Sequence, residues 1–129
     1  MGIVMNAPIV ELELPYPNHT GNHSVRHTRS GGHYLTKEAE AYRLAVSLLV
    51  SPSRVAPKML AGPLRLDWLI APPDLRARDV DNLFKVVCDA LTRCGFWVDD
   101  SNKVITHGAW QWTDPVPGGS IFLTASEAK

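Results

Sequence analysis

The 129-residue sequence has few cysteines, no long apolar run and no net charge, and each absence excludes a class of protein. Its two cysteines, Cys88 and Cys94, lie about 9 Å apart along the axis of one predicted helix, too far for a disulfide. No segment approaches the roughly 20 apolar residues of a membrane-spanning helix, and the first residues lack the features of a secretory signal. We therefore expect a soluble protein with free thiols, located in a reducing cytoplasm.

The charges balance, with 13 basic and 13 acidic residues, but they are unevenly distributed. A net charge of zero argues against strong non-specific binding to nucleic acid. No acid occurs between Glu13 and Glu38, whereas acids concentrate from Asp67 to Asp100. This separation fits either ordinary solvated side chains or a site that binds both negative and positive groups, such as phosphates with their metal ions.

The hydrophobic pattern predicts one domain over residues 1–129 with an α+β fold, in which a mixed sheet packs against two helices. Residues 18–34 have almost no apolar content, so we expect a mobile loop there that is basic and rich in histidine. The expected order is strand, helix, strand, helix, strand, strand. The predicted strands are 9–14, 64–70, 103–112 and 120–125, and the predicted helices are about 36–50 and 82–94.

Acidic residues occur in pairs on either side of the second predicted helix. Asp79 and Asp81 stand one residue apart at its start. In an extended chain both project to one side, whereas in a regular helix they diverge by about 200°, so we expect Asp81 to be the N-cap with Asp79 just before it. A helix N-terminus lowers the cost of gathering negative charge and offers backbone N–H groups to an anion.

The second acidic pair, Asp99 and Asp100, follows a short run after the helix. Six extended residues cover about the length of a thirteen-residue helix, so this run could return either acid to the helix start. Carboxylates gathered there repel one another unless a cation joins them, and oxygen ligands select a hard ion such as Mg²⁺ or Mn²⁺. The site would suit phosphodiester hydrolysis, with Lys85, one turn after Asp81, adding positive charge.

The same residues also fit an interpretation without chemistry. Residues 79–82 could be a helix cap and residues 99–102 a turn rich in turn-forming residues. Lys85, Asp89 and Arg93 are spaced like a solvated row of salt bridges on one helix face. Spacing alone leaves the metal site and the acidic caps and turns both open.

Residues 76–104, which read RARDVDNLFKVVCDALTRCGFWVDDSNKV, resemble the signature of the RusA family of Holliday junction resolvases, small endonucleases associated with phages and prophages. The shared features are D-x-D-N-x-x-K, a helix ending in DAL, a Gly-aromatic-Trp segment and a double Asp. Weaker similarity extends over the chain, since ELPYPNH resembles the family's early strand-to-loop segment and AEAYRLAV its first helix.

The resemblance implies an enzyme that resolves four-way DNA junctions by paired phosphodiester hydrolysis, with Mg²⁺ as cofactor, Mn²⁺ able to substitute and no organic cofactor. It makes Asp79, Asp81 and Asp100 the metal-binding carboxylates and Lys85 the essential lysine, and it leaves the role of Asp99 open. It also implies a homodimer, because a two-fold dimer presents two identical sites to a nearly two-fold junction. The neutral charge departs from the basic family members, which bears on affinity and salt tolerance.

Basic residues outside the signature helix are the candidates for contacting DNA. We expect Arg76 and Arg78 to contact the phosphate backbone near the acids. Arg26, Arg29 and Lys37 either clamp the arms of a junction or belong to a flexible polar loop.

The tryptophans have a structural interpretation. Trp97, Trp110 and Trp112 have apolar neighbours or share a strand face, and we interpret them as core or interface residues. Two other functions stay open: a branched-DNA-binding module of the same fold without activity, and an acid-rich cation-binding or interaction domain with no role on DNA.

Overall fold

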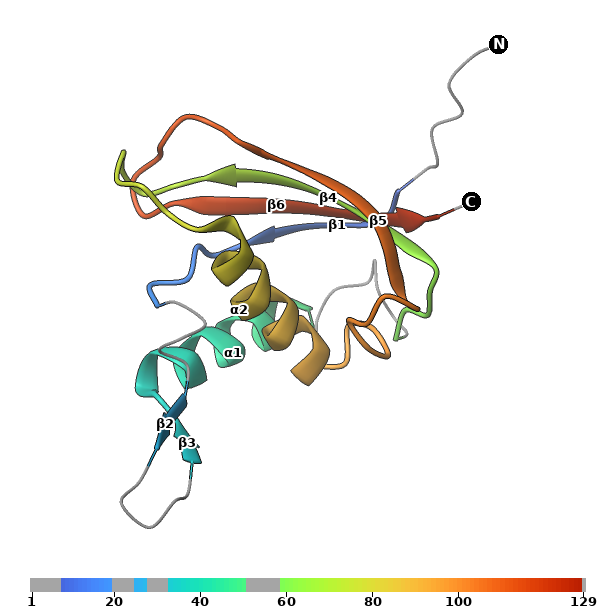
Figure 1. Ribbon diagram of the computed structural model, residues 1–129, viewed down its shortest axis with the longest axis horizontal. Coiled ribbons are helices and arrows are strands. Elements are labelled where there is room, and N and C mark those ends of the chain that lie inside the picture. Colours follow the sequence, from blue (N-terminus) through green and yellow to red (C-terminus); the bar gives the residue numbers. More distant parts are fainter. Residues whose placement is uncertain (1–7, 20–24, 28–32, 51–58, 129) are drawn as a thin grey trace.

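The computed structural model describes residues 8–19, 25–27, 33–50 and 59–128, and these form a small α+β domain (Figure 1). The predicted fold class and order of the main elements are confirmed, with one hairpin in addition. In chain order the elements are β1 (Pro8–Leu14), β2 (Val25–His27), β3 (His33–Leu35), α1 (Lys37–Val50), β4 (Leu64–Ala71), α2 (Val80–Arg93), β5 (Ile105–Trp112) and β6 (Ser120–Glu127).

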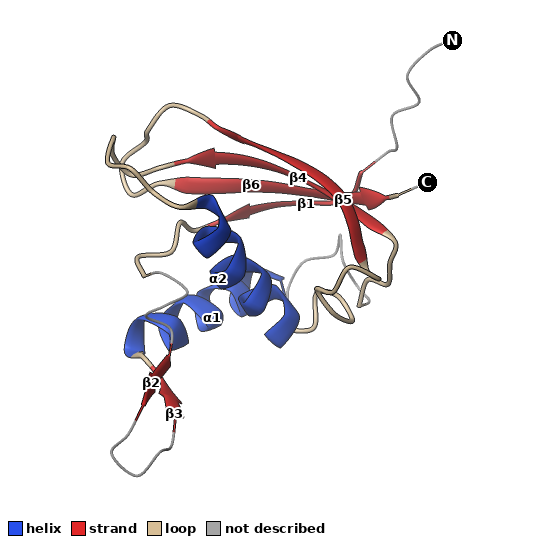
Figure 2. Ribbon diagram, in the orientation of Figure 1, coloured by secondary structure: helices blue, strands red, loops and turns tan. Residues whose placement is uncertain are grey.

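The four long strands form one mixed sheet in the order β1-β6-β4-β5. Strand β5 runs parallel to β4, and the other neighbouring pairs are antiparallel. Both helices lie on the same side of this sheet (Figure 2). Alternate strand residues therefore point into the core, as their period of two requires. The buried ones are Val10, Leu12, Leu14, Leu64, Leu66, Trp68, Ile70, Ile121, Leu123 and Ala125.

Helix α2 connects the two parallel strands and has a well-defined apolar face. Its buried residues recur at helical spacing: Leu83, Val86, Val87, Ala90 and Leu91. The helix ends where Gly95 adopts a φ of 79°, a conformation that glycine accepts without steric cost. Since β4 and β5 are parallel, the start and end of α2 lie toward opposite ends of the sheet (Figure 1).

Helix α1 begins after Thr36, whose hydroxyl oxygen accepts the backbone N–H of Ala39 at 3.3 Å, as is typical of an N-cap residue. Its buried face continues from Val46 to Val50. Leu49, three residues after Val46, is 47% exposed. The reason is that Val50, four residues after Val46, continues the buried row. None of the helices in the described ranges is long and apolar enough to cross a membrane.

Residues 18–34, where we expected a mobile loop, include most of a short antiparallel hairpin, β2–β3. Valine and tyrosine favour extended backbone, and two short strands can pair although the segment has little apolar content. The hairpin lies at the beginning of α1, away from the main sheet (Figure 1). The expected mobility of this loop stays a prediction, and residues 20–24 and 28–32 lie outside the described part.

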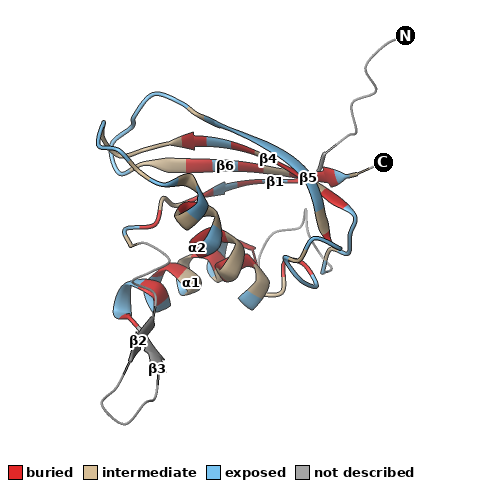
Figure 3. Cartoon of the chain, viewed as in Figure 1, coloured by how far each residue is buried: buried red, intermediate tan, exposed pale blue. Residues whose placement is uncertain are grey.

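The tryptophans separate into a buried and an exposed group. Trp97 is fully buried, and its indole N–H donates to the hydroxyl of Thr92 at 2.7 Å, which confirms the core interpretation. Trp110 lies on the edge strand β5, most of which is exposed (Figure 3), and is itself 48% exposed. Its ring contacts Phe84 of α2 at a centroid distance of 6.2 Å.

Candidate active site

The loop from β4 to α2 is organised by Asp74, a residue that sequence reasoning missed. Its carboxylate accepts the backbone N–H of Arg76 at 2.9 Å and pairs with the guanidinium groups of Arg76 and Arg78 at 3.1 and 2.8 Å. The backbone hydrogen bond first, and then the guanidinium groups, hold the pKa of Asp74 well below its ordinary value. The available signal was the Pro-Pro-Asp sequence, since aspartate commonly bonds to the backbone two residues later in turns.

Arg78 is largely engaged inside the protein. Besides the Asp74 carboxylate, its guanidinium donates to the backbone oxygens of Asp74 and Arg76 at 3.2 and 2.9 Å. It also lies 5.8 Å from the ring centre of Tyr16. Only 18% of the Arg78 side chain is exposed, against 82% for Arg76. Of the two predicted phosphate contacts, Arg76 is therefore the more accessible, whereas Arg78 shapes the loop.

The first acidic pair lies at the start of α2, and the helix begins two residues earlier than expected. The N-cap is Asp79, with φ −91° and ψ 122°, and Asp81 is inside the first turn, so the expectation that Asp81 caps the helix is wrong. The Asp79 side chain makes no capping bond and accepts the amide of Asn82 at 3.4 Å. Asp79, Asp81 and Lys85 are all exposed. Both carboxylates are thus accessible to a cation.

The second acidic pair does not lie at the start of α2, contrary to the expectation from the reach of the segment after the helix. After Gly95 the chain pairs with Leu60, whose N–H donates to the oxygen of Phe96 and whose oxygen accepts the N–H of Val98, each at 2.9 Å. This bridge holds Trp97 in the core and carries the chain toward the start of β5. Tertiary pairing, which the spacing argument ignored, therefore decides where the acids lie.

Asp100 lies beside the middle of α2. It lines a cavity of about 500 Å³ with Phe84, Cys88 and Trp110. Burial, and then the negative charge of Asp100, raises the pKa of the Cys88 thiol to about 12. Cys88 follows Asp81 by seven residues, or about 10 Å along the helix axis. Asp99, the residue before Asp100, is exposed, and its carboxylate accepts the Asp100 backbone N–H at 2.8 Å.

Within the described residues, no three His, Cys, Asp or Glu side chains are grouped to hold one metal ion. Asp79, Asp81 and Asp100 therefore do not form a complete three-ligand set in one chain. The two carboxylates at the start of α2 still fit Mg²⁺, because this ion is often held by one or two carboxylates, with water and substrate phosphates completing the shell.

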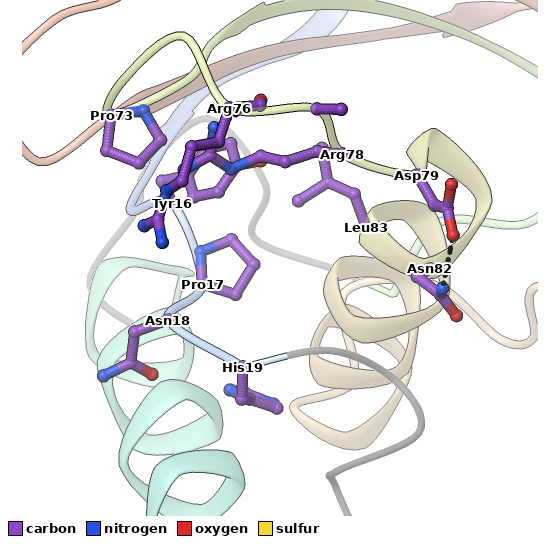
Figure 4. A pocket seen from close by; sticks show the side chains of 11 residues that line it. Tyr16, Pro17, Asn18, His19, Pro73, Arg76, Arg78, Asp79, Asn82 and Leu83 are labelled. Carbon is purple, nitrogen blue, oxygen red and sulfur yellow. Dashed lines mark hydrogen bonds between the residues drawn. The ribbon is translucent and has the colours of Figure 1, made fainter.

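A second cavity, of about 580 Å³, opens beside the first acidic pair. One wall is the segment after β1, and the other is the loop before α2 together with its first turn (Figure 4). Sequence reasoning gave Tyr16, Pro17 and Asn18, on the wall after β1, no role, because their proximity to α2 depends on the tertiary fold. The lining residues include Tyr16, Pro17, Asn18, His19, Arg76, Asp79 and Asn82.

The other predicted DNA contacts lie at the hairpin and the start of α1. Arg26 is in the middle of β2, and Lys37 is the exposed first residue of α1. Arg29 lies outside the described residues. A role for these cations in binding DNA stays a prediction.

Comparison with known proteins identifies the family. A family model described as endodeoxyribonuclease RusA matches residues 15–123, which include the cavity wall, both helices and both acidic pairs. The chain therefore belongs to the RusA family of endodeoxyribonucleases.

Curated relatives support the same assignment. The chain is 39% identical over 117 residues to the crossover junction endodeoxyribonuclease RusA of Enterobacteria phage 82, covering 90% of this chain and 92% of the phage protein. With the same coverage, it is 38% identical to proteins of that name from Escherichia coli K12 and Shigella sonnei Ss046.

Proposed function

We propose that this protein is a Holliday junction resolvase, an endodeoxyribonuclease that cuts two strands of a four-way DNA junction. The observation that carries the proposal is the 39% identity over 90% of the chain to a protein named crossover junction endodeoxyribonuclease. The exposed acids at the start of α2, beside the exposed Arg76, provide a place where such chemistry could occur.

Mg²⁺ is the proposed cofactor, and Mn²⁺ can substitute. Asp79 and Asp81 would hold the ion at the start of α2, and when bound it would supply Lewis-acid stabilisation to the phosphate being cut. Asp100 is the proposed third carboxylate, although in a single chain it lies beside Cys88. Because the three are not grouped, the role of Asp100 has to be tested separately from that of the first pair.

Two cations would position the DNA. Lys85 lies four residues after Asp81, one helical turn further along the same side, and its ammonium would approach the phosphate. Arg76 would hold the neighbouring backbone, since its guanidinium is anchored by Asp74 yet largely exposed. Arg26, Arg29 and Lys37 are proposed to contact the junction arms.

The proposed assembly is a homodimer acting on DNA in the cytoplasm. Two symmetric cuts need two identical sites, and a two-fold dimer supplies them. Since the net charge is zero, recognition would depend on the shape of the junction more than on general attraction to phosphate. We therefore expect weak binding to linear duplex.

The test is cleavage of an end-labelled synthetic four-way junction, beside a linear duplex of the same sequence, with Mg²⁺ or with EDTA. We expect paired cuts in the junction alone, lost with EDTA and in Asp81→Asn. The matched control is Glu38→Gln, which removes an exposed acid from the first turn of the other helix and should leave cutting unchanged.

The same experiment separates this function from its main alternative. A junction that is bound tightly but never cut with any divalent ion would make the protein a branched-DNA-binding module of the same fold. If the junction is neither bound nor cut, both functions on DNA are wrong, and an acid-rich cation-binding or interaction domain is left.

A further inference from the structure

We propose that the cavity between residues 16–19 and the start of α2 binds one unpaired nucleobase of the DNA, beside the phosphodiester that is cut, and so sets the base preference of cutting. This inference rests on the proposed function and adds a specificity site to it. The residues assigned to it are Tyr16, Pro17 and Asn18 on one wall and Asn82 on the other.

The size and place of the cavity suit a single nucleotide. Its volume of about 580 Å³ lies within the range of about 300–1,000 Å³ that is usual for small-ligand sites. Asp79 belongs both to the cavity lining and to the proposed metal pair. A base in the cavity would therefore be joined to a phosphate next to the acids.

The chemistry of the walls fits a base better than a phosphate. A flipped base needs apolar or aromatic surfaces for its faces and hydrogen-bonding groups for its edge. Tyr16 and Pro17 supply the first, and Asn18 and Asn82, which both line the cavity, carry amides for the second. Figure 4 shows Asn82 on the α2 side, across from residues 16–19. The carboxylate of Asp79 in the lining disfavours an anion beside it, whereas Arg76, which also lines the cavity and is largely exposed, can donate to the attached phosphate.

The Tyr16 wall is held in place by contacts on several sides. The hydroxyl of Tyr42 in α1 donates to the backbone oxygen of Pro15 at 2.8 Å, which fixes the segment after β1. Behind Tyr16 lies Gly119, where an added Cβ would come within 2.7 Å of the tyrosine Cβ, so this close approach needs glycine. The guanidinium of Arg78 lies over the tyrosine ring. A wall fixed before DNA binds can favour one base without rearranging.

Base preference tests the inference directly. Four-way junctions carrying each of the four bases at the positions flanking the crossover are cut, and the cut sites are mapped. We expect the unaltered protein to prefer particular bases, and Asn18→Ala and Tyr16→Leu to reduce that preference by about tenfold, with junction binding retained. Tyr16→Phe keeps the ring and should keep the preference.

The matched control is Gln111→Ala, which removes an exposed amide from β5, outside the cavity. It should leave the base preference unchanged. The inference is overturned if the unaltered protein cuts all junctions equally, or if Asn18→Ala and Tyr16→Leu keep its preference. Thermal unfolding of each variant verifies that it is folded.

A second measurement does not depend on cutting. With 2-aminopurine at the flanking position and EDTA present, binding should change its emission at that position alone, and Tyr16→Leu should abolish the change. Cutting without any such change would overturn the cavity assignment and leave the resolvase proposal intact. If the emission changes on binding but the protein does not cut the junction with Mg²⁺, the proposed activity is overturned and the cavity is supported as a base-binding site.

Discussion

The two acidic pairs that flank α2 look alike in sequence but differ in their surroundings. Asp79 and Asp81 begin the helix, next to a loop braced by Asp74 and a cavity with an aromatic wall. Asp99 and Asp100 follow the buried Trp97, which pairs with Leu60, and they lie toward the other end of the sheet. The first pair is placed by local helix geometry, whereas the second is placed by long-range pairing.

This difference follows from the parallel arrangement of β4 and β5. In such a unit the helix runs back along the sheet, so the segment that enters it and the segment that leaves it lie toward opposite ends. Any cooperation between the pairs must overcome that separation. Variants that disturb one pair and spare the other therefore show how far each contributes.

The largest expected effect concerns the anchor of the second pair. Trp97→Ala removes a fully buried ring and its hydrogen bond to Thr92, and we expect the free energy of unfolding to fall by about 3–5 kcal/mol. Trp110→Ala, at a half-exposed tryptophan, should cost less than about 2 kcal/mol. Chemical denaturation measures both free energies of unfolding. Equal decreases in the two variants would show that the buried Trp97 does not anchor the segment before Asp99.

The second effect concerns catalysis within the second pair. If Asp100 acts in cutting, Asp100→Asn should lower the rate of junction cleavage by at least about 100-fold, the upper end of the loss typical of a supporting residue. Asp99→Asn keeps an amide oxygen that can accept the Asp100 backbone N–H, so it removes little more than an exposed charge and should cost less than about tenfold. Single-turnover cleavage gives both rates. Equal rates in the two variants would remove the distinction between the neighbours.

The third effect concerns the brace of the first pair. Arg78→Lys loses the planar fork that contacts Asp74 and the ring of Tyr16, and we expect about 1 kcal/mol of destabilisation. Arg76→Lys, at an exposed side chain, should leave the free energy of unfolding nearly unchanged. If thermal unfolding ranks them in the opposite order, Arg78 is not the structural arginine.

The smallest expected effect is a dependence of stability on pH, caused by the ionisation of Asp74. The pKa of Asp74 in the folded state lies below its ordinary value of 3.8, so its ionised form stabilises the fold above about pH 4, and this contribution is lost as the pH falls further. The difference in melting temperature between the unaltered protein and Asp74→Asn should therefore shrink from about pH 5 to about pH 3. A difference that stays constant would show that the charge of Asp74 does not matter.

The local features of α2 were predictable from sequence. Its apolar face and the terminating Gly95 depend on spacing and on backbone conformation within the segment. The position of Asp100 was not predictable, because it depends on the pairing of Trp97 with Leu60. Leu60 precedes β4 in the sequence and is therefore distant from the segment that it holds. Tyr16 was missed for the same reason, since the cavity beside it exists only once β1 and α2 are packed in one domain.

The position of β6 inside the sheet has a consequence for how the chain is made. Strand β1 is synthesised early, yet its neighbour in the sheet is β6, and β6 also separates it from β4. Until residues 120–127 emerge from the ribosome, the edges of β1 and β4 that pair with β6 carry unpaired backbone N–H and C=O groups. Contacts between such distant segments form slowly and leave the unfinished chain open to aggregation. The newly made protein thus depends on rapid closure of the sheet around β6, or on protection by chaperones until then.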